Sequence, residues 1–187
     1  MRIFIAIDVP EEAKEKAEQV EQEMKALQGS FTFVHKDAMH ITLNFIGDAN
    51  ESIVDNAKRA LDSIGFAPFD ISLHGLSYFS PSFIRVVYIG ISRVNDELAR
   101  LFGLVGEALA NEGVPYEHSG EGIDTFIPHF TIARVKYIKE KRPLLELIAK
   151  HADDDFGTFR AKSIVLKKSV LTENGPVYSN LHEVKFS

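Results

Sequence analysis

The chain has 187 residues, 45% of them hydrophobic and 26% charged, which is enough apolar material for one globular interior. Its net charge of −6 argues against a protein that coats long nucleic acid, since that task requires a basic face, but it allows one that binds only a chain end. The absence of cysteine excludes disulfides, thiolate catalysis and cysteine-bound zinc.

The opening segment is expected to be a strand. "RIFIAI" (2–7) is rich in β-branched and aromatic residues and does not have the charged-then-apolar pattern of a leader. No apolar run approaches the length of a membrane span. We therefore expect a cytoplasmic protein without a membrane segment. We also expect a monomer, although the sequence itself carries no signal of oligomeric state.

Four helices and seven or eight strands are expected in all. The first half predicts a helix after Pro10, strands at "FTFV" (31–34) and "HITLNFI" (40–46), and a helix capped by Asn50. The segments expected after it are strands 69–79 and 83–91, a helix 96–111, strand 129–135, a helix opening near Pro143, and strands 158–172 and 176–186. Paired strands between helices favour an α+β fold of mostly antiparallel sheet with helices outside.

Two strands carry the same polar pair. "HITLNFIG" begins at His40, and "HFTIARV" begins 89 residues later at His129. Residues i and i+2 of a strand share a face, so His40 lies beside Thr42, with Ile41, Leu43 and Phe45 on the other face. His129 and Thr131 share a face in the same way. If the two strands converge, two imidazoles and two hydroxyls line one cleft.

This set of groups suits phosphodiester chemistry. One imidazole can take a proton from water while the other gives a proton to the departing oxygen, since the ordinary pKa of histidine lies near neutral pH. Threonine hydroxyls can donate to the non-bridging phosphoryl oxygens as negative charge grows there. A cyclic phosphodiester has one negative charge and a strained ring, so we expect neither a metal nor a cofactor.

The twin motif resembles that of the 2H phosphoesterase superfamily, and more narrowly the LigT-like RNA 2′,3′-cyclic phosphodiesterases, also called the 2′–5′ RNA ligase family. The resemblance covers the whole chain, including "RIFIAIDVP", both H-x-T strands and "IVLKKSVLTENGPVY". The chain departs from the family at Tyr88, where relatives often carry tryptophan. The resemblance implies a single domain over residues 1–187, built of two pseudo-symmetric lobes with one H-x-T motif each and a cleft between them.

The same resemblance implies an activity and residue roles. It predicts hydrolysis of the terminal 2′,3′-cyclic phosphate of an RNA 3′ end, or of a nucleotide, to a 2′-phosphate, with His40 as proton donor and His129 as proton acceptor. Thr42 and Thr131 would bind the substrate. From the residues alone the two histidines are interchangeable. The alternatives are 2′–5′ ligation in the reverse direction, an esterase for another cyclic phosphate, and a catalytically silent RNA-end-binding module.

Arg134 matches a basic position common in the family, and we name it as a further substrate-binding residue. Strict alternation would place it opposite His129, so either the strand bulges first or Arg134 is a surface cation. Arg85 is a weaker candidate for substrate contact. Lys167 and Lys168 are expected at an exposed strand edge. Two larger sets are expected to be surface or structural: the cations Lys136, Lys139, Lys141 and Arg142, and the histidines His35, His74, His118, His151 and His182. For the cations, the alternative is guidance of the RNA backbone.

Overall fold

The computed structural model describes residues 1–80, 82–92, 96–117, 126–172 and 175–187. Its helices are α1 (Glu11–Lys25), α2 (Glu51–Asp62), α3 (Asp96–Asn111) and α4 (Lys141–Lys150), with a short 3₁₀ helix η1 (Lys36–Ala38). Its strands are β1 (Arg2–Asp8), β2 (Gly29–Phe33), β3 (His40–Asp48), β4 (Phe69–Phe79), β5 (Val86–Ile91), β6 (His129–Ile138), β7 (Asp155–Ala161), β8 (Ser163–Thr172) and β9 (Gly175–Lys185).

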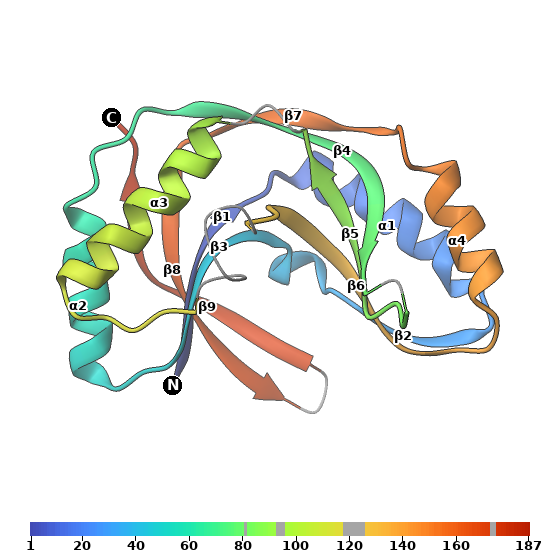
Figure 1. Ribbon diagram of the computed structural model, residues 1–187, viewed down its shortest axis with the longest axis horizontal. Helices are drawn as coiled ribbons and strands as arrows, with labels where there is room; N and C mark the ends of the chain where they lie inside the picture. The colour runs from blue at the N-terminus through green and yellow to red at the C-terminus, as the bar shows by residue number, and fades with distance from the viewer. Residues whose placement is uncertain (81, 93–95, 118–125, 173–174) are drawn as a thin grey trace.

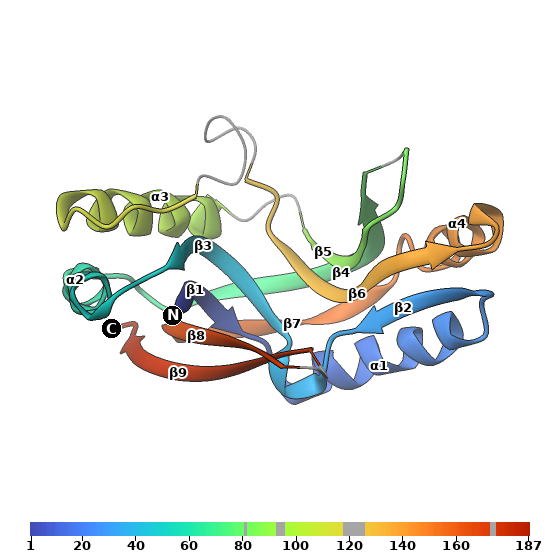
Figure 2. The same ribbon diagram turned by 90° about the horizontal axis from the view of Figure 1, so that it is seen from below.

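All nine of these strands belong to one strongly curved sheet (Figures 1 and 2). Their order is β7-β4-β5-β6-β3-β1-β8-β9, with β2 also paired to β6, and every pairing is antiparallel. The expected α+β fold is confirmed. The curvature matters because it gives the sheet a concave side on which distant strands can face a common space.

The helices lie in two groups on the outside of the curved sheet, as Figure 1 shows. Helices α2 and α3 pack on each other and on strands β9 and β3. Helices α1 and α4 pack on each other and on β6, β7 and β4. The molecule therefore has two lobes, one holding β1, β3, β8 and β9, and the other holding β2 and β4 to β7.

The lobes are joined in the sheet by one backbone pairing, Ile41 of β3 with Phe130 of β6. Both side chains are fully buried. Beyond this point β6 pairs with β2 through Ala133 to Ile138, while β3 continues along β1. The two motif strands therefore meet at the middle residue of each H-x-T and then diverge.

Alternation along β1 shows how the core forms. Ile3, Ile5 and Ile7 have 0 to 1% exposure and face the helices, while the intervening residues face the concave side. Burial of an isoleucine side chain of this kind contributes about 1.5–3 kcal/mol. The buried isoleucines thus anchor β1 to the core, and the side chains on its concave face are free to line a cleft.

Most of the local predictions are confirmed. Pro10 precedes α1, and the Asn50 side chain accepts a hydrogen bond of 2.9 Å from the Ile53 N–H at the start of α2. One strand prediction is wrong: segment 158–172 contains two strands, β7 and β8, which separate at Lys162. β7 is the end strand beside β4, whereas β8 lies near the other end of the sheet, between β1 and β9. None of the described helices is both long and apolar enough to cross a membrane.

Glu21 on α1 provides a test of this packing. Its side chain is 6% exposed, and its Oε1 has no hydrogen-bond partner among the described residues. Burial raises the pKa of this carboxyl from 4.5 to about 7. The folded protein therefore binds the proton more tightly than the unfolded chain does, and this contribution to stability is lost as the pH rises from 4.5 to 7.

We expect Glu21→Gln to raise the melting temperature relative to wild type above about pH 8. Below about pH 5 the same substitution should raise the melting temperature less. The difference between the two conditions should be on the order of 5 °C. Thermal unfolding followed by circular dichroism at the two pH values measures it. Glu12→Gln, at an exposed position of the same helix, is the matched control. An equal effect of Glu21→Gln at both pH values would contradict the argument.

Candidate active site

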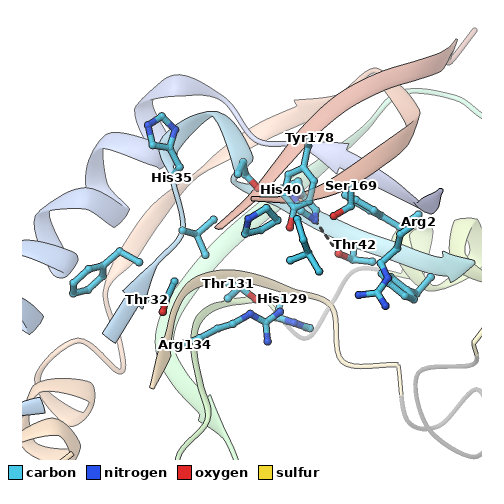
Figure 3. A pocket seen from close by; sticks show the side chains of 17 residues that line it. Arg2, Thr32, His35, His40, Thr42, His129, Thr131, Arg134, Ser169 and Tyr178 are labelled. Carbon is cyan, nitrogen blue, oxygen red and sulfur yellow. Dashed lines mark hydrogen bonds between the residues drawn. The ribbon is translucent and has the colours of Figure 1, made fainter. Parts of the chain in front are cut away.

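The concave side of the sheet holds a cleft of about 560 Å³, lined from β1, β2, β3, β6, β8 and β9 (Figure 3). This volume lies within the range of small-molecule sites. His40 and Thr42 line the cleft from β3, and His129, Thr131 and Arg134 line it from β6. The structure thus brings together the five residues that the sequence singled out.

The quartet follows from the strand register. Because Ile41 pairs with Phe130 in an antiparallel ladder, His40 lies across from Thr131, and Thr42 lies across from His129. The paired apolar residues point into the core, so the four polar side chains all point to the concave side. Each imidazole therefore has a threonine on its own strand and another across from it.

A β-bulge brings Arg134 to the same face. The register of β5 with β6 shifts between Val87 and Tyr88, so that Ile132 and Ala133 are both buried and alternation resumes at Arg134. Of the two alternatives in the sequence, the bulged strand is the one observed. The Arg134 side chain is exposed at the cleft and points into it beside His129 (Figure 3).

A similar bulge in β3 makes one prediction wrong. Phe45 was expected on the core face with Ile41 and Leu43, but it lines the cleft. The register of β1 with β3 shifts between Ile5 and Ala6, so Leu43 and Asn44 are both buried and the following residue is turned to the concave side. Phe45 thus stands five residues after His40, as Arg134 stands five residues after His129.

Backbone carbonyls fix the orientation of both imidazoles. His40 Nδ1 donates to the Ala38 carbonyl at 2.7 Å, and His129 Nδ1 donates to the Ile127 carbonyl at 2.8 Å. A carbonyl can only accept, so each Nδ1 carries a hydrogen and each neutral ring has its lone pair on Nε2. His40 Nε2 in turn accepts from the Thr42 hydroxyl at 3.1 Å. In both rings the nitrogen that can accept a proton is therefore Nε2.

Burial lowers the pKa of both histidines. Desolvation lowers the pKa of His40 from 6.5 to about 4, opposed by the Ala38 hydrogen bond and assisted by the positive charge of Lys167. Desolvation also lowers the pKa of His129, and the Arg134 charge acts in the same direction. In the free protein near neutral pH, both rings are neutral.

Aromatic rings pack against both imidazoles. His40 lies 4.8 Å from the Phe4 ring and 5.2 Å from the Tyr178 ring. His129 lies 4.8 Å from the Phe79 ring and 5.2 Å from the Tyr88 ring, measured between centroids. Tyr88 is 8% exposed and stacks on Phe79, so it supports His129 and does not line the cleft. Burial also raises the pKa of Tyr178, which keeps its hydroxyl a hydrogen-bond donor.

The expectation that Lys167 lies at an exposed edge is wrong. It is 6% exposed, because β8 lies inside the sheet between β1 and β9. Its Nζ pairs with Asp8 Oδ1 at 2.9 Å and donates to Asn180 Oδ1 at 2.8 Å. Asp8 is the strand partner of His40, so this ion pair between a buried lysine and an exposed aspartate lies next to the motif histidine.

The other basic candidates lie outside the cleft. Arg85 is exposed and stacks over the Phe83 ring at 5.8 Å. The cations Lys136, Lys139, Lys141 and Arg142 are exposed, and none of them lines the cleft. They are therefore surface cations, as expected.

The remaining histidines differ in their surroundings. His35 is an exposed loop residue at the cleft margin, and His74 is exposed. His151 is 8% exposed and bonds Asp154 at 2.6 Å and Glu23 at 3.1 Å, a structural role. His182 bonds Asp62 at 2.7 Å. His118 lies outside the described residues.

Several cleft residues were missed from the sequence. Arg2 and Phe4 of β1, and Ser169 and Tyr178 of the β8–β9 hairpin, line the cleft. The alternation of "RIFIAI" does place Arg2 and Phe4 on one face, opposite the isoleucines, but nothing local says that this face is the cleft. The hairpin residues carry no motif, because only the β1–β8 pairing brings them to the site.

Comparison with known proteins agrees with this geometry. Residues 7–88 match the family model for LigT-like phosphoesterases. The RNA 2′,3′-cyclic phosphodiesterase of Methanocaldococcus jannaschii is 38% identical over 185 residues, which are 98% of this chain and 99% of that protein.

Two crystal structures share the fold. A protein of Thermus thermophilus has a TM-score of 0.78 at 24% identity, covering 100% of this chain and 98% of that one. Escherichia coli LigT complexed with 3′-AMP has a TM-score of 0.74 at 20% identity, covering 100% and 97%. Since the archaeal relative matches over nearly the full length of both chains, this chain belongs to the LigT-like phosphoesterases, a family of 2H phosphoesterase enzymes.

Proposed function

We propose that the protein hydrolyses the 2′,3′-cyclic phosphate at an RNA 3′ end, or on a nucleotide, to a 2′-phosphomonoester. The observation that carries this proposal is the pairing of Ile41 with Phe130, which sets two Nε2-presenting imidazoles and two threonine hydroxyls around one space. General acid–base hydrolysis of a phosphodiester requires a base on one side of the phosphorus and an acid on the other, and this arrangement provides both.

In the proposed reaction His129 Nε2 takes a proton from water as the water oxygen bonds to phosphorus. The bond from phosphorus to the 3′ oxygen breaks, and His40 Nε2 gives its proton to that oxygen. Thr42, Thr131 and Arg134 donate to the non-bridging oxygens and stabilise their growing charge. Protons and charge are thus handled by side chains, and the mechanism requires no metal. If the 5′ hydroxyl of a second RNA replaces water as the nucleophile, the same two proton transfers form a 2′–5′ linkage and release the 3′ hydroxyl, which is the ligase alternative.

The lowered histidine pKa values fit this scheme once substrate is bound. His40 must carry a proton before the reaction, yet burial lowers its pKa in the free protein. A phosphodiester anion between the two rings favours the imidazolium form, which raises the pKa of both. The negative charge of the bound substrate thereby favours the protonated form of His40, the proposed general acid.

The comparisons support the same substrate class. The Methanocaldococcus jannaschii relative is named an RNA 2′,3′-cyclic phosphodiesterase, and Escherichia coli LigT was crystallised with 3′-AMP. A cleft of about 560 Å³ lined by aromatic rings and cations suits a nucleotide. We take an RNA end or a cyclic nucleotide to be the partner of this chain.

We further propose that residues 1–187 act as one domain of two pseudo-symmetric lobes. Each lobe gives a histidine whose Nδ1 binds the carbonyl two residues earlier, then a threonine, then a bulge, then a cleft residue. In one lobe that last residue is Phe45, and in the other it is Arg134. The lobes thus share their geometry and differ in chemistry.

The first test is removal of each imidazole. His40→Ala and His129→Ala should each lower kcat on a 2′,3′-cyclic nucleotide about 10²–10⁴-fold, since each removes one proton transfer. Binding of a 2′-nucleotide, measured by calorimetry, should remain detectable. Thr42→Val and Thr131→Val should each lower kcat by a smaller factor than loss of a histidine. His74→Ala, which removes an exposed imidazole far from the motifs in sequence, is the control. Normal turnover by both motif variants would refute the assignment.

The second test is the pH dependence of turnover. Both histidines have lowered pKa values in the free protein, so kcat/KM should be bell-shaped with its maximum below about pH 6.5. The bound anion raises both pKa values, so the maximum of kcat should lie at higher pH. Steady-state rates from about pH 4 to about pH 9 measure both profiles. A kcat maximum on the acid side of the kcat/KM maximum would contradict the proposed role of the anion.

The third test is metal removal. Turnover of a 2′,3′-cyclic nucleotide should continue at its full rate in excess EDTA, because the proposed steps use only side chains. Protein dialysed against the chelator and assayed with and without it gives the comparison. Loss of activity that added Mg²⁺ or Mn²⁺ restores would overturn the mechanism. Separation of 2′- from 3′-phosphate products on the same samples tests which oxygen leaves.

A further inference from the structure

A row of polar side chains crosses the cleft beside the quartet. Arg2 of β1 is the strand partner of Ser169 on β8, and Ser169 is the strand partner of Tyr178 on β9. All three side chains line the cleft, as Figure 3 shows. One guanidinium and two hydroxyls therefore stand in line across three neighbouring strands. The proposed mechanism gives them no role.

The Arg2 guanidinium is available for a ligand. The side chain is exposed, and none of the ion pairs or side-chain hydrogen bonds found among the described residues involves it. Its strand partner on the other side is Asp48, which is also exposed, at the end of β3. An unpaired arginine that lines a cleft beside a serine is a typical phosphate contact.

Arg2 lies at a distance from the four motif residues His40, Thr42, His129 and Thr131. Ala6 is the strand partner of Thr42, and Arg2 lies four residues before Ala6, about 13 Å along the strand. The reacting phosphate already has Arg134 beside it on the other lobe. Arg2 is therefore placed for a different negative charge from the one that the quartet holds.

The row of Arg2, Ser169 and Tyr178 lies on the side of the cleft where the leaving group departs in the proposed reaction. In the proposed function the 3′ oxygen leaves on the His40 side, and the rest of the RNA is attached to that ribose. Arg2, Ser169 and Tyr178 belong to the same lobe as His40. The chain on the 5′ side of the terminal nucleotide thus runs toward this row.

We propose that Arg2 and Ser169 form a subsite for the internucleotide phosphate that precedes the terminal, cyclic-phosphate nucleotide, with Tyr178 bordering it. This inference rests on the proposed function. It makes the preferred substrate an RNA end of at least two nucleotides, and it makes Arg2 a specificity-determining residue.

The test uses a dinucleotide ending in a 2′,3′-cyclic phosphate, in two forms. One form has the normal internucleotide phosphodiester, and the other has a neutral methylphosphonate there. Wild type should prefer the charged form in kcat/KM by about tenfold, the size of a hydrogen bond to a charged group. Arg2→Gln should reduce this preference to near one, and Ser169→Ala should reduce it in part.

Lys168→Gln is the matched control. It removes one positive charge next to Ser169 on β8, but Lys168 lies on the other face of the strand and does not line the cleft. Its preference for the charged dinucleotide should match that of wild type. The preference should also fall with added salt in wild type and not in Arg2→Gln.

The outcomes separate this inference from the proposed function. If wild type hydrolyses both dinucleotides at equal rates, or if Arg2→Gln keeps the wild-type preference, the subsite is refuted while the phosphodiesterase activity stands. An equal loss by Arg2→Gln on both dinucleotides would assign Arg2 to the reacting phosphate and also refute the subsite. Hydrolysis of neither form would refute the proposed function itself.

Discussion

The site depends on one short backbone contact between two strands that are far apart in the chain. Ile41 and Phe130 pair across the junction of β3 and β6, and both are fully buried. Burial of these two side chains holds the junction closed, and alternation then turns the flanking histidines and threonines to the concave side. A slip of one residue in either strand would direct its imidazole and hydroxyl into the core, so the hydrophobic packing enforces the register of the motif residues.

The sequence predicted the quartet because both motifs follow the simple alternation of a strand for three residues. It did not predict which way Phe45 points, because the bulge at Leu43 and Asn44 depends on pairing with β1. For Arg134 the sequence left two alternatives, because strict alternation places this residue opposite His129 whereas a phosphate contact requires the same face. The bulge at Ile132 and Ala133 turns Arg134 to the face of His129. Local pattern thus predicts residues within an unbroken strand, whereas the points at which a strand breaks are set by its neighbours.

The same limit explains the errors at the C-terminal end. The segment 158–172 has continuous strand character, and nothing in it shows that Lys162 carries the chain from one end of the sheet toward the other. Because β8 then lies between β1 and β9, Lys167 is buried and paired with Asp8. A lysine in a strand usually indicates an edge, and here the charge is tolerated because Asp8 and Asn180 satisfy it.

The proposed reaction gives different roles to two histidines that have similar surroundings. Their carbonyl contacts and threonine neighbours are alike, so the distinction has to come from residues outside the H-x-T motifs. On the His129 side the bulge presents the cation Arg134, and on the His40 side the nearby cation is Lys167; both charges favour neutral imidazole, so charge alone does not separate the two rings. On the His40 side the residue that corresponds to Arg134 is Phe45, and Phe4 and Tyr178 pack on the His40 ring, so this side offers aromatic rings on which a nucleobase can stack. In the proposed reaction, the difference between Phe45 and Arg134, each five residues after its motif histidine, would therefore give the cleft its direction, with the phosphoryl charge beside Arg134 and the departing nucleotide beside the aromatic rings.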